Sequence, residues 1–272
     1  MLALNRIKAL VRYTSDSFTT PVRLLVGQRT LLKLLIRREM VARTSGTLLG
    51  SVWMVVQPAL QIVALWFFLD IVLKIRSPGR VSFVNYFLIG MICWSMISEI
   101  LQRNLTVMVE FGSLYQRTIF PLPLLPLLPS LVSGAIYGSV IVAVAGLIEG
   151  PGAAFGALVA TLLLVVWLIP FGYFLAVLGL FVREARQVVP FALTLLLYLT
   201  PILYMPEQLP MVLQEWSALN PLADAMVLLH AVVQGQAWTL GNLLRPLVLW
   251  AVLTPVAWML FKRTEMHMRE AL

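Results

Sequence analysis

The sequence predicts an all-α polytopic membrane protein with six transmembrane helices, an N-terminal amphipathic interface helix, and short external re-entrant helices between spans five and six. Two observations support this fold class. Hydrophobic side chains make up 60% of the 272 residues and charged side chains only 12%, which is too little polar surface for a soluble globule. The apolar residues also gather in runs near the roughly 20 residues that a helix needs to cross a bilayer.

The first element is an amphipathic helix over residues 17–43, ahead of the first span. Leucine and isoleucine side chains from Leu24 to Ile36 recur at helical spacing on one face, and Arg29, Lys33 and Arg37 form the opposite stripe. Such a helix suits the membrane surface, with its cations toward anionic head groups; packing on another protein is the alternative. We therefore divide the chain into a cytosolic N-terminal region, residues 1–46, and a six-span transmembrane domain, residues 47–272.

The six spans follow in order, separated by short polar or proline-containing links. A series of prolines precedes the third span and is expected to break or kink the helix at its start. Residues 205–242 are amphipathic pieces too short to cross the bilayer, and we interpret them as external re-entrant or surface helices; five or seven spans would follow if they were misread. The predicted spans are residues 48–73, 83–101, 131–148, 153–182, 188–204 and 243–261.

The distribution of basic residues predicts the orientation of these spans. Lysine and arginine are retained on the cytoplasmic side, and the six-span layout puts 16 of the 20 there. Both termini are therefore expected in the cytosol. The same bias accounts for the formal net charge of +8 without a nucleic-acid partner.

Motifs for chemistry on this chain are missing from the sequence. The nucleotide cradle GxxxxGK[ST] needs a lysine after a glycine, but all four lysines follow an apolar residue. The two histidines, His230 and His267, are predicted on opposite sides of the membrane, and no HExxH or GxSxG occurs. Asp70 and Glu99 lie near span ends, where pairing at the interface is favoured over a proton relay. We expect no catalytic residue, metal or cofactor on this chain.

The segment from Arg37 to Pro58 resembles the start of the ABC-2 type exporter permeases. It has an arginine pair followed by Arg43, Gly46, Leu48, Leu49, Gly50, Trp53 and Pro58. Further matches follow in the same order, from Tyr115 to Pro123, from Thr200 to Pro210, and at Asn220 with Pro221. Within that family the chain is similar to the polysaccharide-export branch, whose members export O-antigen, capsular polysaccharide or teichoic acid.

The resemblance implies a multi-pass permease subunit of the bacterial inner (cytoplasmic) membrane that moves a lipid-linked polysaccharide from the cytoplasmic side across that membrane. It also implies a homodimer bound to two copies of a separate nucleotide-binding ATPase, which would hold ATP and Mg. The other partners would be a polyprenyl-pyrophosphate-linked polysaccharide and membrane lipids. A short cytosolic helix at about residues 110–119 would dock on the ATPase through Glu110, Tyr115, Gln116 and Arg117.

Two further sets of residues are predicted to meet the substrate. Arg29, Lys33, Arg37, Arg38 and Arg43 are candidates for the pyrophosphate head group, because cations bind such dense anions by charge-assisted hydrogen bonds. The alternative is that they only orient the protein. Sugar C–H faces pack on aromatic rings, so aromatic side chains are candidates for a glycan channel, although the same residues suit a membrane-interface belt or a core. These candidates are Trp53, Trp66, Tyr86, Trp94, Tyr198 and Tyr204.

Two other functions are compatible with this sequence. One is an ABC-2 permease that exports a drug or a small lipid, which would share the layout without needing a wide path. The other is a non-transport membrane scaffold of a glycan-synthesis complex.

Overall fold

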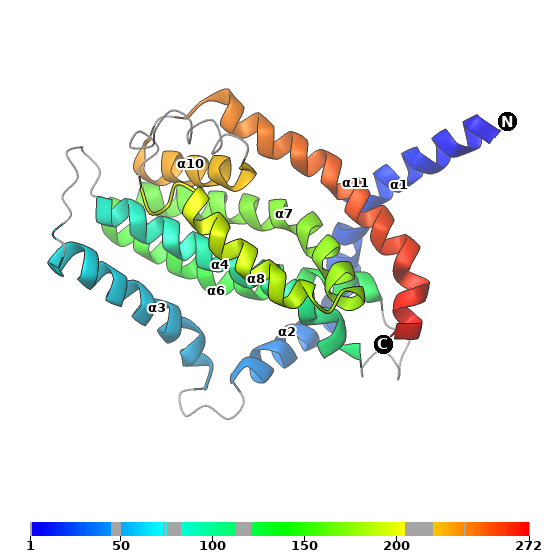
Figure 1. The fold of residues 1–272 in the computed structure, drawn as a ribbon, viewed down its shortest axis with the longest axis horizontal. Helices are drawn as coiled ribbons and strands as arrows, with labels where there is room; N and C mark the ends of the chain where they lie inside the picture. Colours follow the sequence, from blue (N-terminus) through cyan, green and yellow to red (C-terminus); the bar gives the residue numbers. More distant parts are fainter. Residues whose placement is uncertain are drawn as a thin grey trace.

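The computed structural model describes residues 2–44, 50–72, 74, 83–112, 121–204, 220–236 and 238–271. Over these residues the secondary structure is helical, without a strand, which confirms the all-α prediction. The short elements are the 3₁₀ helices η1 (Gly50–Val52) and η3 (Leu122–Leu124) and the π-helical η2 (Phe67–Val72). The α-helices are α1 (Leu2–Gly27), α2 (Arg29–Thr44), α3 (Trp53–Trp66), α4 (Phe83–Glu110), α6 (Leu127–Glu149), α7 (Pro151–Phe181), α8 (Ala185–Leu199), α10 (Pro221–Gln234) and α11 (Leu240–Ala271) (Figure 1).

Helix α4 occupies the centre of the bundle. It packs against α6 and α7, with α8 and α10 beside it, while α3 runs along one side and α11 along the other (Figure 1). In its most apolar 18-residue window 72% of the residues are buried, against 22% to 33% in the other long apolar helices. Because α4 is enclosed by the rest of the chain, its side chains form the core of the subunit.

Small residues allow the long helices to approach closely. A Cβ atom on Gly134 of α6 would lie 2.7 Å from Val165 of α7, and one on Gly138 would lie 2.8 Å from Thr161. Glycine at these positions therefore brings the two backbones together, as in many membrane-helix interfaces.

Four helices in the described part of the chain are long and apolar enough to cross a membrane: Phe83–Glu110, Leu122–Glu149, Pro151–Phe181 and Leu240–Met268. They contain the predicted spans two, three, four and six, which are confirmed as spanning-length helices. The predicted first and fifth spans coincide with shorter helices, α3 continued by η2, and α8. Helix α8 ends at Leu199 because Thr200 has an extended backbone and Pro201 follows.

The helix that holds the predicted third span, α6, starts earlier than the sequence predicts. Helix α6 begins at Leu127 rather than near Leu131, with Pro126 at the N-cap and Pro129 in the first turn. Backbone N–H groups in the first turn have no partner within the helix, so a proline there costs no hydrogen bond. The prolines therefore begin this helix instead of shortening it.

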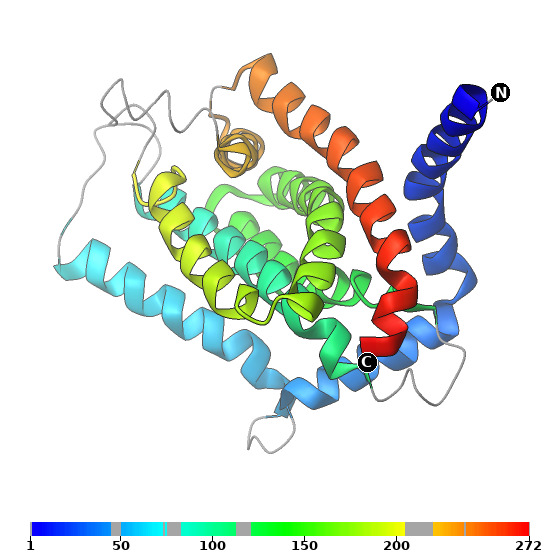
Figure 2. The same cartoon turned by 45° about the vertical axis from the view of Figure 1, so that its right-hand side comes forward.

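The predicted helix over residues 17–43 is two helices in the structure, because α1 ends at Gly27 and α2 begins at Arg29. The leucine face is present, but it packs on the chain's own bundle: Leu35 is buried in a cluster with Phe111, Trp258 and Phe261. The leucine face therefore packs in part on the bundle, since Leu24, Leu25, Leu31, Leu32 and Ile36 are half-buried against the same cluster. Helix α2 crosses the end of the bundle near the C-terminus (Figure 2).

A short helix, α10, lies where external helices are predicted before the last span. Its N-cap Asn220 accepts a hydrogen bond from the N–H of Leu222 at 3.0 Å and donates one to Thr200 Oγ1 at 2.9 Å. The helix ends at Gly235, whose φ of 65° favours glycine. The other predicted external piece, residues 205–219, lies outside the described residues.

Candidate functional site

The basic residues of α2 divide into an exposed group and an enclosed one. Arg29, Lys33 and Arg37 lie exposed on the face opposite the buried Leu35. Arg38 places its guanidinium carbon 5.0 Å from the centre of the Phe111 ring, in a cation–π contact. This exposed face can receive an anion, whereas Arg43 lies elsewhere.

Arg43 is enclosed in a group of alternating charges that we call the α2–α4 charge cluster: Glu39 and Arg43 of α2 with Glu99 and Arg103 of α4. Within the helices, Arg43 lies 2.8 Å from Glu39 and Arg103 lies 3.3 Å from Glu99. Between the helices, Arg43 lies 3.4 Å from Glu99 and Arg103 lies 3.7 Å from Glu39. Each carboxylate therefore contacts both guanidinium groups.

The charge cluster continues toward two further elements. Arg103 lies 3.5 Å from Glu110, the last residue of α4, and Thr106 donates a hydrogen bond of 2.6 Å to Glu110. Arg43 also donates a hydrogen bond of 3.2 Å to the hydroxyl of Ser133 on α6. The predicted pairing of Glu99 is confirmed, with Arg43 and Arg103 as its partners, while the sequence analysis did not identify the part played by Glu39. The spacing of four residues in Glu39/Arg43 and Glu99/Arg103 is the signal that could have revealed it.

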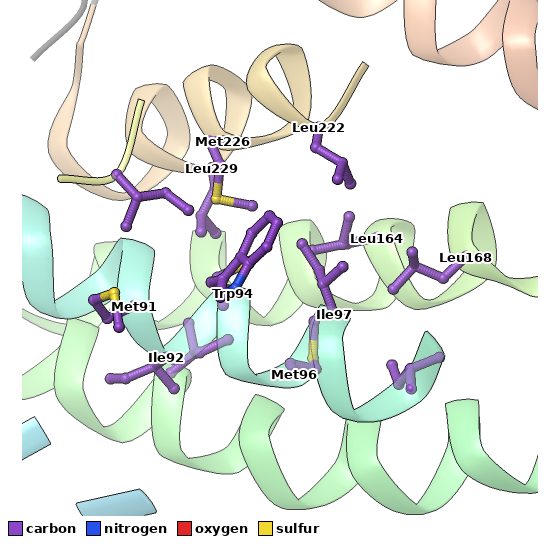
Figure 3. Close-up of a cluster of buried hydrophobic side chains, with 14 of the residues drawn as sticks. Met91, Ile92, Trp94, Met96, Ile97, Leu164, Leu168, Leu222, Met226 and Leu229 are labelled. Carbon is purple, nitrogen blue, oxygen red and sulfur yellow. The ribbon is translucent and has the colours of Figure 1, made fainter. Parts of the chain in front are cut away.

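The six aromatic channel candidates do not come together within this chain. Tyr86 and Trp94 are buried in the core, and Trp94 points toward Met226 and Leu229 of α10 (Figure 3). Trp53 and Trp66 are about 40% exposed on α3. A channel lined by aromatic rings would therefore use the exposed members of the set.

Tyr198 and Tyr204 lie close together at the C-terminal end of α8, Tyr198 exposed and Tyr204 half-buried. Tyr198 is 59% exposed, and the hydroxyl of Tyr204 donates a hydrogen bond of 3.1 Å to the Tyr198 carbonyl oxygen. Of the two, Tyr198 is thus the more accessible to a ligand or to a second copy of the chain.

Among the predicted docking residues, only Glu110 is described. Its carboxylate is 42% exposed at the end of α4, beside Arg103 and Thr106. Tyr115, Gln116 and Arg117 lie outside the described residues. Glu110 therefore marks where the docking segment would begin.

His230 and Cys93 both lie in the core of the described part of the chain. His230 stacks on Tyr86 with ring centroids 3.9 Å apart and contacts Gln234, and Cys93 is a buried free thiol. Within the residues that the structure describes, no group of three or more His, Cys, Asp or Glu side chains could hold a metal ion.

The four membrane-length helices in the described part of the chain define the class of protein as a helical membrane protein. Residues 30–233 match the model of the ABC-2 type transporter family, and the chain belongs to that family. Members of this family are transmembrane subunits that work with an ATPase.

Curated relatives are more specific in name but distant in sequence. The chain is 22% identical over 203 residues to the O-antigen export system permease protein RfbA of Klebsiella pneumoniae, covering 72% of this chain and 77% of the relative. It is 24% identical over 222 residues to the protein of the same name from Myxococcus xanthus, covering 78% and 83%.

Proposed function

We propose that this chain is the transmembrane subunit of an ATP-driven exporter that moves a lipid-linked polysaccharide, O-antigen or a related cell-surface glycan, across the bacterial inner membrane. The observation that carries this proposal is the similarity to O-antigen export permeases over about three quarters of the chain. Six spans, formed by the four long helices with α3 and α8, and a re-entrant α10 complete the proposed architecture.

The energy source in this proposal is a separate subunit. Two copies of a nucleotide-binding ATPase, each holding ATP and Mg, would bind a homodimer of this chain through the segment that starts at Glu110. The missing nucleotide cradle supports this division of labour. Both termini and α2 would lie on the cytosolic side, which agrees with the excess of lysine and arginine in the links assigned to that side.

The substrate path in this proposal begins at α2. The exposed Arg29, Lys33 and Arg37 would attract the pyrophosphate head group from the cytosolic leaflet. The glycan would then pass the exposed rings of Trp53, Trp66 and Tyr198, along a path between two copies of the chain.

Reconstitution tests the proposal. The permease would be placed in proteoliposomes with the ATPase from the neighbouring coding sequence, and ATP-dependent movement of a polyprenyl-linked polysaccharide would be followed by its accessibility to an added glycosidase. The matched control carries an ATPase whose cradle lysine is replaced by alanine. We expect movement only with the intact ATPase.

The two alternatives give different results in the same system. A permease for a drug or small lipid would move those compounds and leave the polysaccharide in place. A scaffold would move neither, and its deletion in cells would stop glycan synthesis instead of letting the lipid-linked polysaccharide accumulate inside. Either result would reject the proposed export of polysaccharide.

A further inference from the structure

We propose that the α2–α4 charge cluster is the mechanical link that couples the ATPase end of α4 to the cation-bearing helix α2. Glu39, Arg43, Glu99 and Arg103 are then positioning residues for export. This inference rests on the proposed function for its meaning in the transport cycle.

The geometry of the cluster fixes one helix against the other. Two of its four pairs run along a single helix and two cross from α2 to α4, with Arg43 to Glu99 at 3.4 Å and Arg103 to Glu39 at 3.7 Å. The two crossing pairs together use all four residues, so sliding either helix along the other disturbs both pairs at once. The cluster therefore sets the register and the angle of α2 on α4.

Burial makes this link costly to break. The side chains of Glu39 and Arg43 are only 7% and 8% exposed, and those of Glu99 and Arg103 are 33% and 30% exposed. Removing Glu99 or Arg103 would leave its enclosed partner on α2 with one counter-charge instead of two and little water to replace the lost one, whereas a fully exposed pair exchanges partners with solvent easily. Apolar packing of Leu35 on the bundle also holds α2, but that attraction is non-directional. The charge pairs therefore determine how α2 is oriented on the bundle.

The cluster connects to both ends of the proposed coupling path. Arg103 contacts Glu110, the last residue of α4, from which the docking segment would continue. On α2 the exposed cations Arg29, Lys33 and Arg37 belong to the same continuous helix as Glu39 and Arg43. A displacement of the α4 end by the ATPase would thus pass along α4 to the two crossing pairs, and through them to the helix that carries the cationic face.

Charge exchange within one helix isolates the crossing pairs. The α4 swap combines Glu99→Arg with Arg103→Glu, and the α2 swap combines Glu39→Arg with Arg43→Glu. Each swap keeps the net charge and an opposite pair four residues apart, but it sets like charges across the helices. The quadruple variant restores opposite charges across the helices. Both the α4 swap and the quadruple variant lose the Arg103–Glu110 pair, so comparing them tests the crossing pairs alone.

Two measurements are made on these variants in proteoliposomes with the ATPase. One is polysaccharide exported per ATP hydrolysed. We expect each swap to lower this ratio at least tenfold and the quadruple variant to recover it to within threefold of the wild type. The matched control exchanges the pair on α11, Lys262→Glu with Glu265→Lys, which are 2.8 Å apart in the wild type, and should leave the ratio unchanged.

The other measurement is the distance between spin labels at Leu34→Cys on α2 and Gln102→Cys on α4, two exposed positions, in a Cys93→Ala background. We expect a narrow distance distribution in the wild type and the quadruple variant and a broad one in each swap. A structural role without coupling would broaden the distribution in a swap and leave export per ATP unchanged.

The outcomes decide the proposal separately from the proposed function. Export per ATP within twofold of the wild type in either swap overturns the link, as does a quadruple variant that regains the narrow distribution without regaining export. If no swap can be purified folded, Glu99→Gln decides by the same two measurements. If the wild type moves no polysaccharide, the proposed function fails, while the label distances still show whether the charges hold α2 on α4.

Discussion

The carbonyl oxygen of Leu105 on α4 occupies the space that a side chain on Gly179 of α7 would need. The obstacle is backbone and not the end of a flexible side chain, so the two helices would have to move apart to admit even a methyl group. This contact explains why a glycine is needed near the end of a long apolar helix.

We therefore predict that Gly179→Ala destabilises the protein. Overpacking of this kind costs about 1–3 kcal/mol, against a gain of roughly 0.5–1 kcal/mol that alanine brings to a helix where space allows. The matched control is Gly152→Ala at the start of the same helix, where a Cβ would meet nothing within 4 Å. Thermal unfolding in detergent compares the two, and equal midpoints for both variants would contradict the prediction.

A second prediction concerns the contact between the start of α4 and the end of α8. The Tyr86 hydroxyl donates a hydrogen bond of 2.5 Å to the carbonyl oxygen of Pro201, and both residues are buried. Tyr86→Phe removes the donor and leaves the carbonyl without it, which should lower the free energy of unfolding by about 1–3 kcal/mol. Its stacking on His230 should persist, because phenylalanine keeps the ring.

The control for this change is Tyr198→Phe, on the exposed face of α8, which should leave the free energy of unfolding within roughly 0.5 kcal/mol. Unfolding curves of the two variants in detergent provide the measurement. If Tyr86→Phe unfolds like the wild type, the bond to Pro201 contributes nothing to stability.

The long spans could be predicted from the sequence because their signal is local. A run of apolar side chains with few charges specifies a membrane helix wherever it packs, and spans two, three, four and six illustrate this. The start of α6 was placed too late because Pro126 and Pro129 read as helix breakers, although both fit the unpaired N–H positions of a first turn. The series of prolines does not show by itself which of them falls in the first turn of the helix.

The candidate site was less predictable because it depends on contacts between distant segments. The periodicity of α2 correctly predicted that its leucines and its exposed cations lie on different faces. It did not predict what covers the leucines, since Phe111, Trp258 and Phe261 come from other parts of the chain. Likewise, the sequence alone groups Arg43 with the other four cations, because its contact with Glu99 joins two segments that are far apart along the chain. Trp94 shows the same limit, because a tryptophan in an apolar run suits a core and a channel equally well.

A third prediction concerns the docking segment. Tyr115→Ala with Arg117→Glu should lower ATP-dependent polysaccharide export, because the ATPase would lose an aromatic contact and meet a reversed charge. Membrane insertion should be unaffected, since both residues lie outside the predicted spans. Export and ATPase recruitment by purified permease are the measurements, with the exposed-turn variant Arg183→Glu as a charge-reversed control. Full export and recruitment in the double variant would reject docking at this segment.

The last prediction concerns the cationic face of α2. Replacing Arg29, Lys33 and Arg37 with glutamine should weaken binding of a polyprenyl pyrophosphate about tenfold, because each exposed charge contributes only about 0.2–1 kcal/mol. The weakening should disappear at high salt, where exposed charges are screened.

The triple variant keeps the buried Leu35 face, so its fold should be unchanged. Arg183→Gln, at the exposed turn between α7 and α8, is the matched control. Binding measured by microscale thermophoresis at low and high salt separates the two possible roles of these cations. Equal affinity for the triple variant and the wild type at low salt would mean that they orient the protein and take no part in recognising the head group.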